Sequence, residues 1–255
     1  MIPMDPVVWM LVFARVSAML VVLPMFSGSY LPVQLRIALS ALLAFFTASA
    51  LPSLNLPGAS LGLLVGLFAT EVCVGLLLGF VGRIVFFALD IAGSVMATEM
   101  GLMLAADFNP FNTARSQAPG TILNFLAITL FFSLDLHHWL LIGFQRTYDL
   151  LPIGEAHLTG LLFTTTIMKT AWMFMAAVQI AAPLIAISFV ISLVFSVLGR
   201  AVPQMNVFTE SFAFRTMAGL VVFGMTLNLM AQHISNYLHQ LPEDILRVAQ
   251  LLSGK

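Results

Sequence analysis

The feature that most constrains this chain is an apolar run that begins near Ser60 and hardly stops before Ala106. A helix rises about 1.5 Å per residue and the hydrocarbon core of a bilayer is about 30 Å thick, so roughly 20 residues span it. The run is therefore too long for a single span. We expect a helical hairpin or one long bent helix, with its interruption at Gly82 and Arg83.

Other apolar runs of similar character occur along the chain, separated by prolines, glycines and polar turns. They cover approximately residues 6–24, 33–50, 121–134, 158–198 and 208–237. Hydrophobic residues make up 60% of the sequence and charged residues only 8%, whereas soluble domains carry about a quarter of charged residues. The sequence therefore predicts an all-α, polytopic membrane protein. Polar residues from Arg146 to His157 indicate a wet loop, and Pro183 predicts a kink.

The segment from Glu99 to Gly120 differs from the apolar runs on either side of it. Its two prolines end any helix at or before them. Asp107 and Arg115 are costly in hydrocarbon, yet Phe108 and Phe111 are too apolar for an ordinary polar loop. Irregular backbone at membrane depth is tolerated only where protein buries it or where it lines a cavity. We therefore expect this segment to lie in or over a pathway and to close it.

Glycines recur at helical spacing at Gly58, Gly62 and Gly66, and again at Gly75 and Gly79. Residues four apart share a helix face, and small residues there let two backbones approach closely. Two interpretations of this pattern carry equal weight. The glycines pack helices together inside this chain, or they contact neighbouring subunits.

Seven charged residues lie inside or at the edge of apolar runs: Arg15, Glu71, Asp90, Glu99, Lys169, Glu210 and Arg215. Each costs about 2.5–3.5 kcal/mol at a bilayer centre. They must face partners or a wet cavity, or lie outside the hydrocarbon. Because the arginines of the loops also give no clear orientation, we expect neighbouring subunits to provide much of the environment. The alternative is an ion-coupled carrier that uses Glu71, Asp90 and Glu99 as relay groups.

Several classes of function are disfavoured by the sequence. It contains no HExxH, GxSxG, GxxxxGK[ST] or EF-hand pattern, so we expect no enzyme, metal or cofactor. The net charge of -1 does not suggest nucleic acid, and the single Cys73 excludes an internal disulfide. His137 and His138 lie in the segment DLHHW, which we expect to be an interfacial turn with Trp139 at headgroup depth. Adjacent side chains point apart on a helix. We therefore expect His137 and His138 to be solvent-exposed loop residues rather than metal ligands.

Several segments together resemble the FliR family, a component of the flagellar type III export gate that is related to the SctT family of virulence injectisomes. These segments are the first apolar run ending in Pro24, ATEMG from Ala97 to Gly101, DFNPFNTARSQAPG from Asp107 to Gly120, and PQMNVFTESFAFR from Pro203 to Arg215. The similarity covers essentially the whole chain in length and in the order of segments.

The resemblance implies kinked helical hairpins, with a FliP-like part over residues 1–175 and a FliQ-like hairpin and amphipathic tail over residues 176–255. It implies a non-catalytic structural and gating subunit in the bacterial inner membrane, within the flagellar basal body and partly above the membrane on the periplasmic side. The implied partners are FliP, FliQ, FlhB and FlhA, and unfolded flagellar subunits would pass through the gate.

The resemblance also implies site residues. A pore-closing loop maps to about residues 106–120, and the gating candidates within it are Phe108, Asn109, Pro110, Phe111, Asn112 and Arg115. Aromatic side chains dewet a constriction, although these phenylalanines would also serve to anchor the loop on the helices. The subunit-contact candidates are glycines of the recurring spacing and polar residues in or after the turn from Gly199 to Asn206. They are Gly62, Gly66, Gly75, Gly79, Gln204, Asn206, Glu210 and Arg215.

Overall fold

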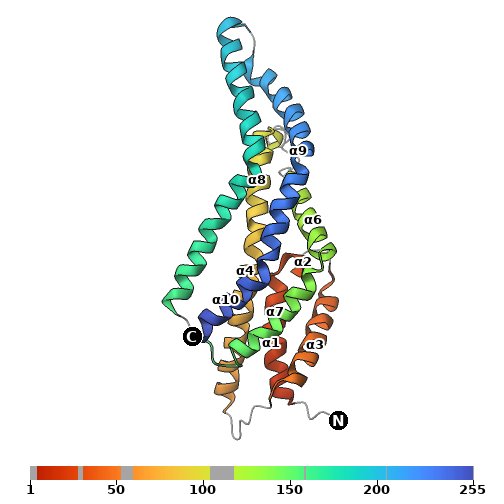
Figure 1. Cartoon of the computed structure of the whole chain (residues 1–255), viewed down its shortest axis with the longest axis vertical. Helices are drawn as coiled ribbons and strands as arrows, with labels where there is room; N and C mark the ends of the chain where they lie inside the picture. The colour runs from red at the N-terminus through yellow and green to blue at the C-terminus, as the bar shows by residue number, and fades with distance from the viewer. Residues whose placement is uncertain are drawn as a thin grey trace. The chain divides into compact units, whose positions relative to one another are not determined.

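The computed structural model describes residues 5–27, 31–52, 60–103, 118–157, 159–204 and 206–254. In these ranges the chain is built from α-helices and contains no strand, which confirms the predicted all-α fold (Figure 1). The helices are α1 (Pro6–Val22), α2 (Pro24–Ser27), α3 (Val33–Ala50), α4 (Leu61–Glu99), α6 (Ala118–Ser133), α7 (Leu136–Leu150), α8 (Gly160–Ala201), α9 (Val207–His239) and α10 (Leu241–Ser253).

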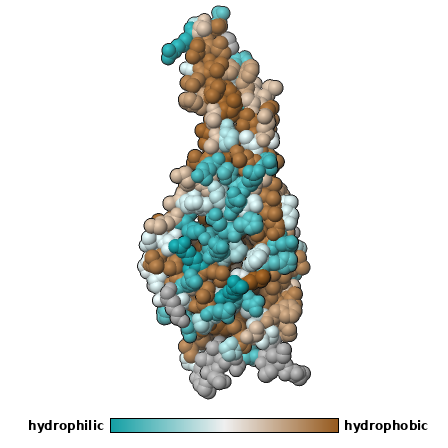
Figure 2. Space-filling model, viewed as in Figure 1, coloured by the Kyte–Doolittle hydropathy of each residue, from teal (hydrophilic) through white to brown (hydrophobic). Residues whose placement is uncertain are grey.

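Four helical stretches of the described chain are long and apolar enough to cross a membrane. They are α3, α4, α8 and the stretch Thr209–Ser253, and the broken pair α6 and α7 makes a fifth if it counts as one span. The prediction of a polytopic membrane protein is confirmed. Apolar side chains cover much of the visible surface of the hairpin formed by α8 and α9 (Figure 2).

The chain divides into two compact units. The first contains residues Met1–Ile84, Asp135–Lys169 and His239–Lys255. Within it α1 packs on α2 and α3, and α10 packs on α7. Asp5 caps α1 by accepting a hydrogen bond from the Val7 amide at 2.9 Å, and Pro6 occupies the first turn, where a missing N–H costs nothing.

The contact between α1 and α4 depends on the absence of side chains on α4. A Cβ atom at Gly79 would lie 2.8 Å from the Met19 carbonyl oxygen and 2.8 Å from the Val22 Cβ. A Cβ atom at Gly75 would collide with the backbone of Arg15. The close approach of these two helices therefore requires glycine at both positions.

The second unit contains residues Val85–Leu134 and Thr170–Leu238. Here Gly93 of α4 touches the backbone of Gly120 in α6, another approach that leaves no room for a side chain. The helices α8 and α9 meet through the Trp172 and Tyr237 rings, whose centroids are 4.8 Å apart. Pro183 lies inside α8, and α8 is drawn with a bend part-way along its length (Figure 1).

Three expectations about boundaries are corrected. The helix α4 continues through Gly82 and Arg83 without a break, since Gly82 packs against the side chain of Leu23. Residues 146–150 belong to α7 rather than to a wet loop, because Thr147 and Tyr148 are buried. The turn between α8 and α9 begins at Val202, three residues later than expected.

Candidate functional site

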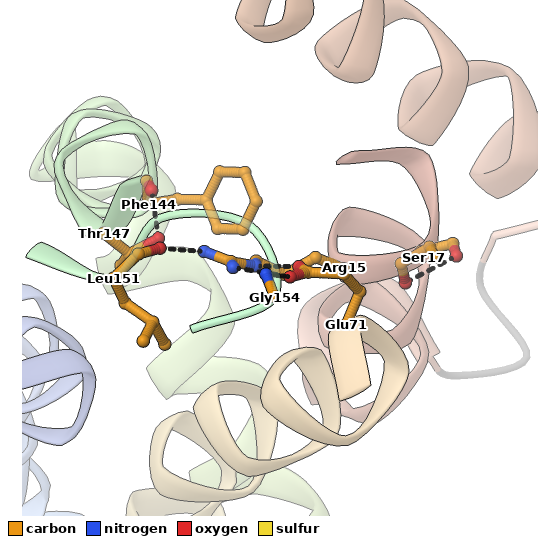
Figure 3. Close-up of polar contacts among 8 residues, drawn as sticks. Arg15, Ser17, Glu71, Phe144, Thr147, Leu151 and Gly154 are labelled. Carbon is orange, nitrogen blue, oxygen red and sulfur yellow. Dashed lines mark hydrogen bonds and ion pairs between the residues drawn. The ribbon is translucent and has the colours of Figure 1, made fainter. Parts of the chain in front are cut away.

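Arg15 is completely buried in the middle of α1, within the first unit. Its Nε donates to Glu71 Oε2 at 2.5 Å and its Nη2 donates to Glu71 Oε1 at 3.0 Å, so the pair is bidentate (Figure 3). Its Nη1 donates to the carbonyl oxygen of Leu151 at 3.2 Å. The guanidinium carbon lies 4.2 Å from the centre of the Tyr148 ring. All three guanidinium nitrogens therefore donate a hydrogen bond, and the Tyr148 ring covers one face of the cation.

Glu71, equally buried on α4, completes the cluster. Its Oε1 also accepts a hydrogen bond from the Gly154 amide at 3.0 Å. Gly154 has a φ of +83°, and a Cβ atom there would run into the Leu67 side chain, so the loop after α7 needs glycine to aim this amide. We call Arg15, Glu71, Tyr148, Leu151 and Gly154 the arginine cluster. It joins α1, α4, α7 and the loop that follows α7.

The arginine cluster is a buried ion-pair network that holds helices together. Both carboxylate oxygens of Glu71 are taken by N–H donors, and Arg15 compensates the charge, so no acid or base is presented to a substrate. The sequence singled out both residues as embedded charges but did not pair them. The available signal was that an ionisable residue within an apolar run requires a partner, and that these two carry opposite charges.

Two other embedded charges also find partners inside this chain. Lys169 of α8 forms an ion pair with Asp244 of α10, with both side chains partly exposed. In the second unit, Oδ1 of the exposed Asp90 accepts a hydrogen bond from the side-chain Nδ2 of Asn124 at 2.6 Å. Partners for these charges therefore do not have to come from neighbouring subunits.

The four glycine candidates separate into two pairs. Gly75 and Gly79 are buried against α1, as described above. Gly62 and Gly66 are exposed, and a Cβ atom at Gly66 would meet nothing within 4 Å. Packing inside the chain thus accounts for one pair, and contact with a neighbouring subunit stays a prediction for the other.

The candidates around the turn between α8 and α9 are exposed except for Arg215. Asn206 caps α9: its Oδ1 accepts from the Thr209 amide at 3.4 Å. Glu210 lies in the first turn of α9, where the helix dipole favours an acid. Arg215 donates from Nη2 to the Ser192 hydroxyl at 2.9 Å, and its buried Nε has no hydrogen-bond partner among the described residues. Gln204 lies in the turn itself.

The gating candidates Phe108, Asn109, Pro110, Phe111, Asn112 and Arg115 lie outside the described residues. The end of the expected loop is described: residues 118–120 form the first turn of α6. The expectation that His137 and His138 diverge is wrong, because their ring centroids are 4.0 Å apart. The turn predicted over DLHHW is shorter than expected: it comprises Leu134 and Asp135, and residues 136–139, with both rings, belong to α7.

The fold and the arginine cluster together define a class: a multi-pass helical membrane protein in which Arg15 and Glu71, the fully buried charged residues of the described chain, pair with one another. Residues 7–241 match the model of a protein family described as bacterial export proteins, family 1. The chain belongs to this family.

Relatives with known names support the same assignment. The flagellar biosynthetic protein FliR of Caulobacter vibrioides is 30% identical over 222 residues, which cover 87% of this chain and 88% of that protein. FliR of Escherichia coli K12 is 26% identical over 241 residues, with 93% and 92% covered. FliR of Bacillus subtilis 168 is 28% identical over 234 residues, with 89% of each covered. The resemblance to the FliR family is confirmed.

Proposed function

We propose that this chain is a non-catalytic structural subunit of the flagellar export apparatus in the bacterial inner membrane. The observation that carries the proposal is the family match over residues 7–241, together with relatives named FliR that align along most of both chains. The arginine cluster agrees with a structural role, because it holds the fold and offers no reactive group.

The surfaces of α3, α8 and α9 support a place in an assembly. In an apolar 18-residue part of each stretch, the buried share is 17% in α3, 28% in α8 and 11% in Thr209–Ser253. In α4 the corresponding share is 61%. Lipid or protein must cover the apolar remainder. We propose that FliP and FliQ subunits cover part of it, and that FlhB and FlhA complete the apparatus.

Within that assembly we propose that the loop at about residues 106–120, whose last three residues form the first turn of α6, closes the export channel, with Phe108 and Phe111 as the apolar stoppers. The composition of the segment supports this role, because Phe108 and Phe111 are apolar enough to seal a constriction and Pro110 disfavours a continuous helix. The division into a FliP-like part up to residue 175 and a FliQ-like part beyond it also stays a prediction. That boundary falls inside α8 and concerns likeness to other subunits, not contacts within the chain.

The alternative of an ion-coupled carrier gains no support from the described residues. Glu71 is sealed in the arginine cluster. Asp90 and Glu99 are nine residues apart on α4, about 14 Å along a helix, which is too far for direct proton transfer. A relay would need further groups between them.

The proposed function predicts which proteins co-purify with the chain. When an affinity-tagged chain is extracted from native membranes with detergent, we expect a large hetero-oligomer that contains other export-apparatus subunits. Native mass and subunit composition are measured on the purified complex. A carrier would instead run as a monomer or a symmetric homo-oligomer, and that outcome would refute the proposal.

The gating role predicts a leak. Replacing Phe108 and Phe111 together with alanine removes the aromatic side chains that dewet the constriction, so small ions should pass the assembled gate. Conductance of the purified complex in planar bilayers measures this. The matched control is Phe125→Ala with Phe132→Ala, which removes two exposed phenylalanines of α6, a helix outside the surfaces proposed above for subunit contact, and should leave the complex sealed. An unchanged, sealed conductance in the first variant would argue that these phenylalanines only anchor the loop.

A further inference from the structure

We propose that Asp135, His137 and His138 form a binding site for a divalent transition-metal ion at the start of α7. None of these residues belongs to the arginine cluster or to the proposed plug, so the site is distinct from both. Each residue offers one ligand atom, and these atoms all lie within 4.8 Å of one another.

The convergence of the two imidazoles is the main observation. Consecutive residues on a helix are rotated by about 100°, so their side chains normally point apart. Here the ring centroids are 4.0 Å apart, with planes tilted by 37°. Repulsion between two charged rings at this distance would be strong, whereas a shared metal ion binds neutral imidazoles and favours their approach.

Asp135 supplies the third ligand. Its backbone is left-handed, with a φ of 56°, and its side chain makes no capping hydrogen bond to α7. Instead its Oδ1 lies 3.5 Å from the Nδ1 of His138. Ligand atoms around a metal with bonds of about 2.0–2.2 Å are separated by roughly 3–3.5 Å, so this pair is already close to the spacing required. A carboxylate also offsets the partial positive charge of a helix N-terminus, which would otherwise repel a cation.

The donor set selects a class of metal. Imidazole nitrogen with carboxylate oxygen suits Zn²⁺, Ni²⁺ and Cu²⁺ better than Mg²⁺ or Ca²⁺, which prefer oxygen ligands. The Asp135 and His138 side chains are 74% and 63% exposed. Remaining coordination positions would therefore be open to water, and the ion would exchange with solvent. Such a site resembles a regulatory or assembly site more than a buried structural one.

The test is a Zn²⁺ titration of the full chain, purified in detergent with a tag that contains no histidine and monitored by competition with a colorimetric chelator. We expect one Zn²⁺ per chain. The variants His137→Ala, His138→Ala and Asp135→Asn should each weaken binding by about tenfold or more, since even loss of an outer-shell partner costs that much. Asparagine tolerates the left-handed backbone at position 135, so this variant removes the charge without strain.

Matched controls come from exposed residues of the same types. His157→Ala and Asp149→Asn remove an exposed histidine and an exposed aspartate outside the cluster, and they should leave Zn²⁺ affinity unchanged. Replacing Zn²⁺ with Co²⁺ gives visible absorption bands that reveal nitrogen ligation. The proposal is overturned if the three cluster variants bind Zn²⁺ as tightly as the unmodified chain, or if the control variants weaken binding equally. Thermal unfolding of each variant checks that the fold is retained.

Discussion

Replacing Arg15 with methionine is expected to lower the free energy of unfolding of this chain by about 3–5 kcal/mol, because the change leaves the Glu71 carboxylate buried without its counter-charge. Glu71→Gln should cost a similar amount, since it strands the guanidinium of Arg15. Both residues are completely buried, so water cannot take over the role of the lost partner. Denaturant titration of the detergent-solubilised chain measures the change.

The double variant Arg15→Met with Glu71→Gln separates charge pairing from other effects. It carries no buried charge, and the glutamine oxygen can still accept the Gly154 amide. We expect it to recover much of the stability that either single variant loses. Lys169→Met is the matched control, since its ion pair with Asp244 is partly exposed, and it should cost about 1 kcal/mol or less. Losses that simply add in the double variant would show that the two charges do not stabilise one another.

The positions of the long helices could be predicted from the sequence because their ends carry local signals. The helix α3 begins and ends where predicted, since Pro32 precedes it and Pro52 follows it closely. The tail helix α10 likewise starts at Leu241 with Pro242 and two acids in its first turn. Prolines and acids act through the backbone of their own turn, so these boundaries need no knowledge of distant contacts.

One failed prediction depended on a distant contact, and another on local spacing. Gly82 weakens a helix by about 1 kcal/mol relative to alanine, but packing against Leu23 offsets this cost and α4 continues. The apolar spacing of Leu140, Phe144, Tyr148 and Leu151 did indicate a helix through residue 150, and the polar residues nearby concealed it.

The arginine cluster could be predicted only in part. The sequence shows that Arg15 and Glu71 require partners, because both lie within apolar runs. It does not show that Gly154 supplies an amide and Leu151 a carbonyl, since that depends on the path of the loop after α7. Backbone amides and carbonyls are present in every residue, so the sequence does not show which of them bind a buried charge. The contacts of the loop after α7 with Arg15 and Glu71 are therefore seen only in the structure.

The glycines of α4 give the second large prediction, because Gly75 and Gly79 differ from Gly66 in surroundings but not in residue type. Gly79→Ala should lower the free energy of unfolding by about 1–3 kcal/mol, since its Cβ atom would collide with the Met19 carbonyl oxygen and α1 must shift to admit it. Gly75→Ala should cost at least as much, because the collision there is with the backbone of Arg15. Denaturant titration again measures the change.

Gly66→Ala is the matched control within the same helix. A Cβ atom there meets nothing within 4 Å, so alanine should leave stability unchanged or raise it by up to about 1 kcal/mol through its better helix propensity. Gly66→Leu then tests the surface itself. If neighbouring subunits approach α4 at Gly66, leucine should reduce the yield of the purified hetero-oligomer while the isolated chain unfolds as before. A full yield of complex would place Gly66 against lipid, and equal destabilisation by Gly66→Ala and Gly79→Ala would contradict the packing of α1 on α4.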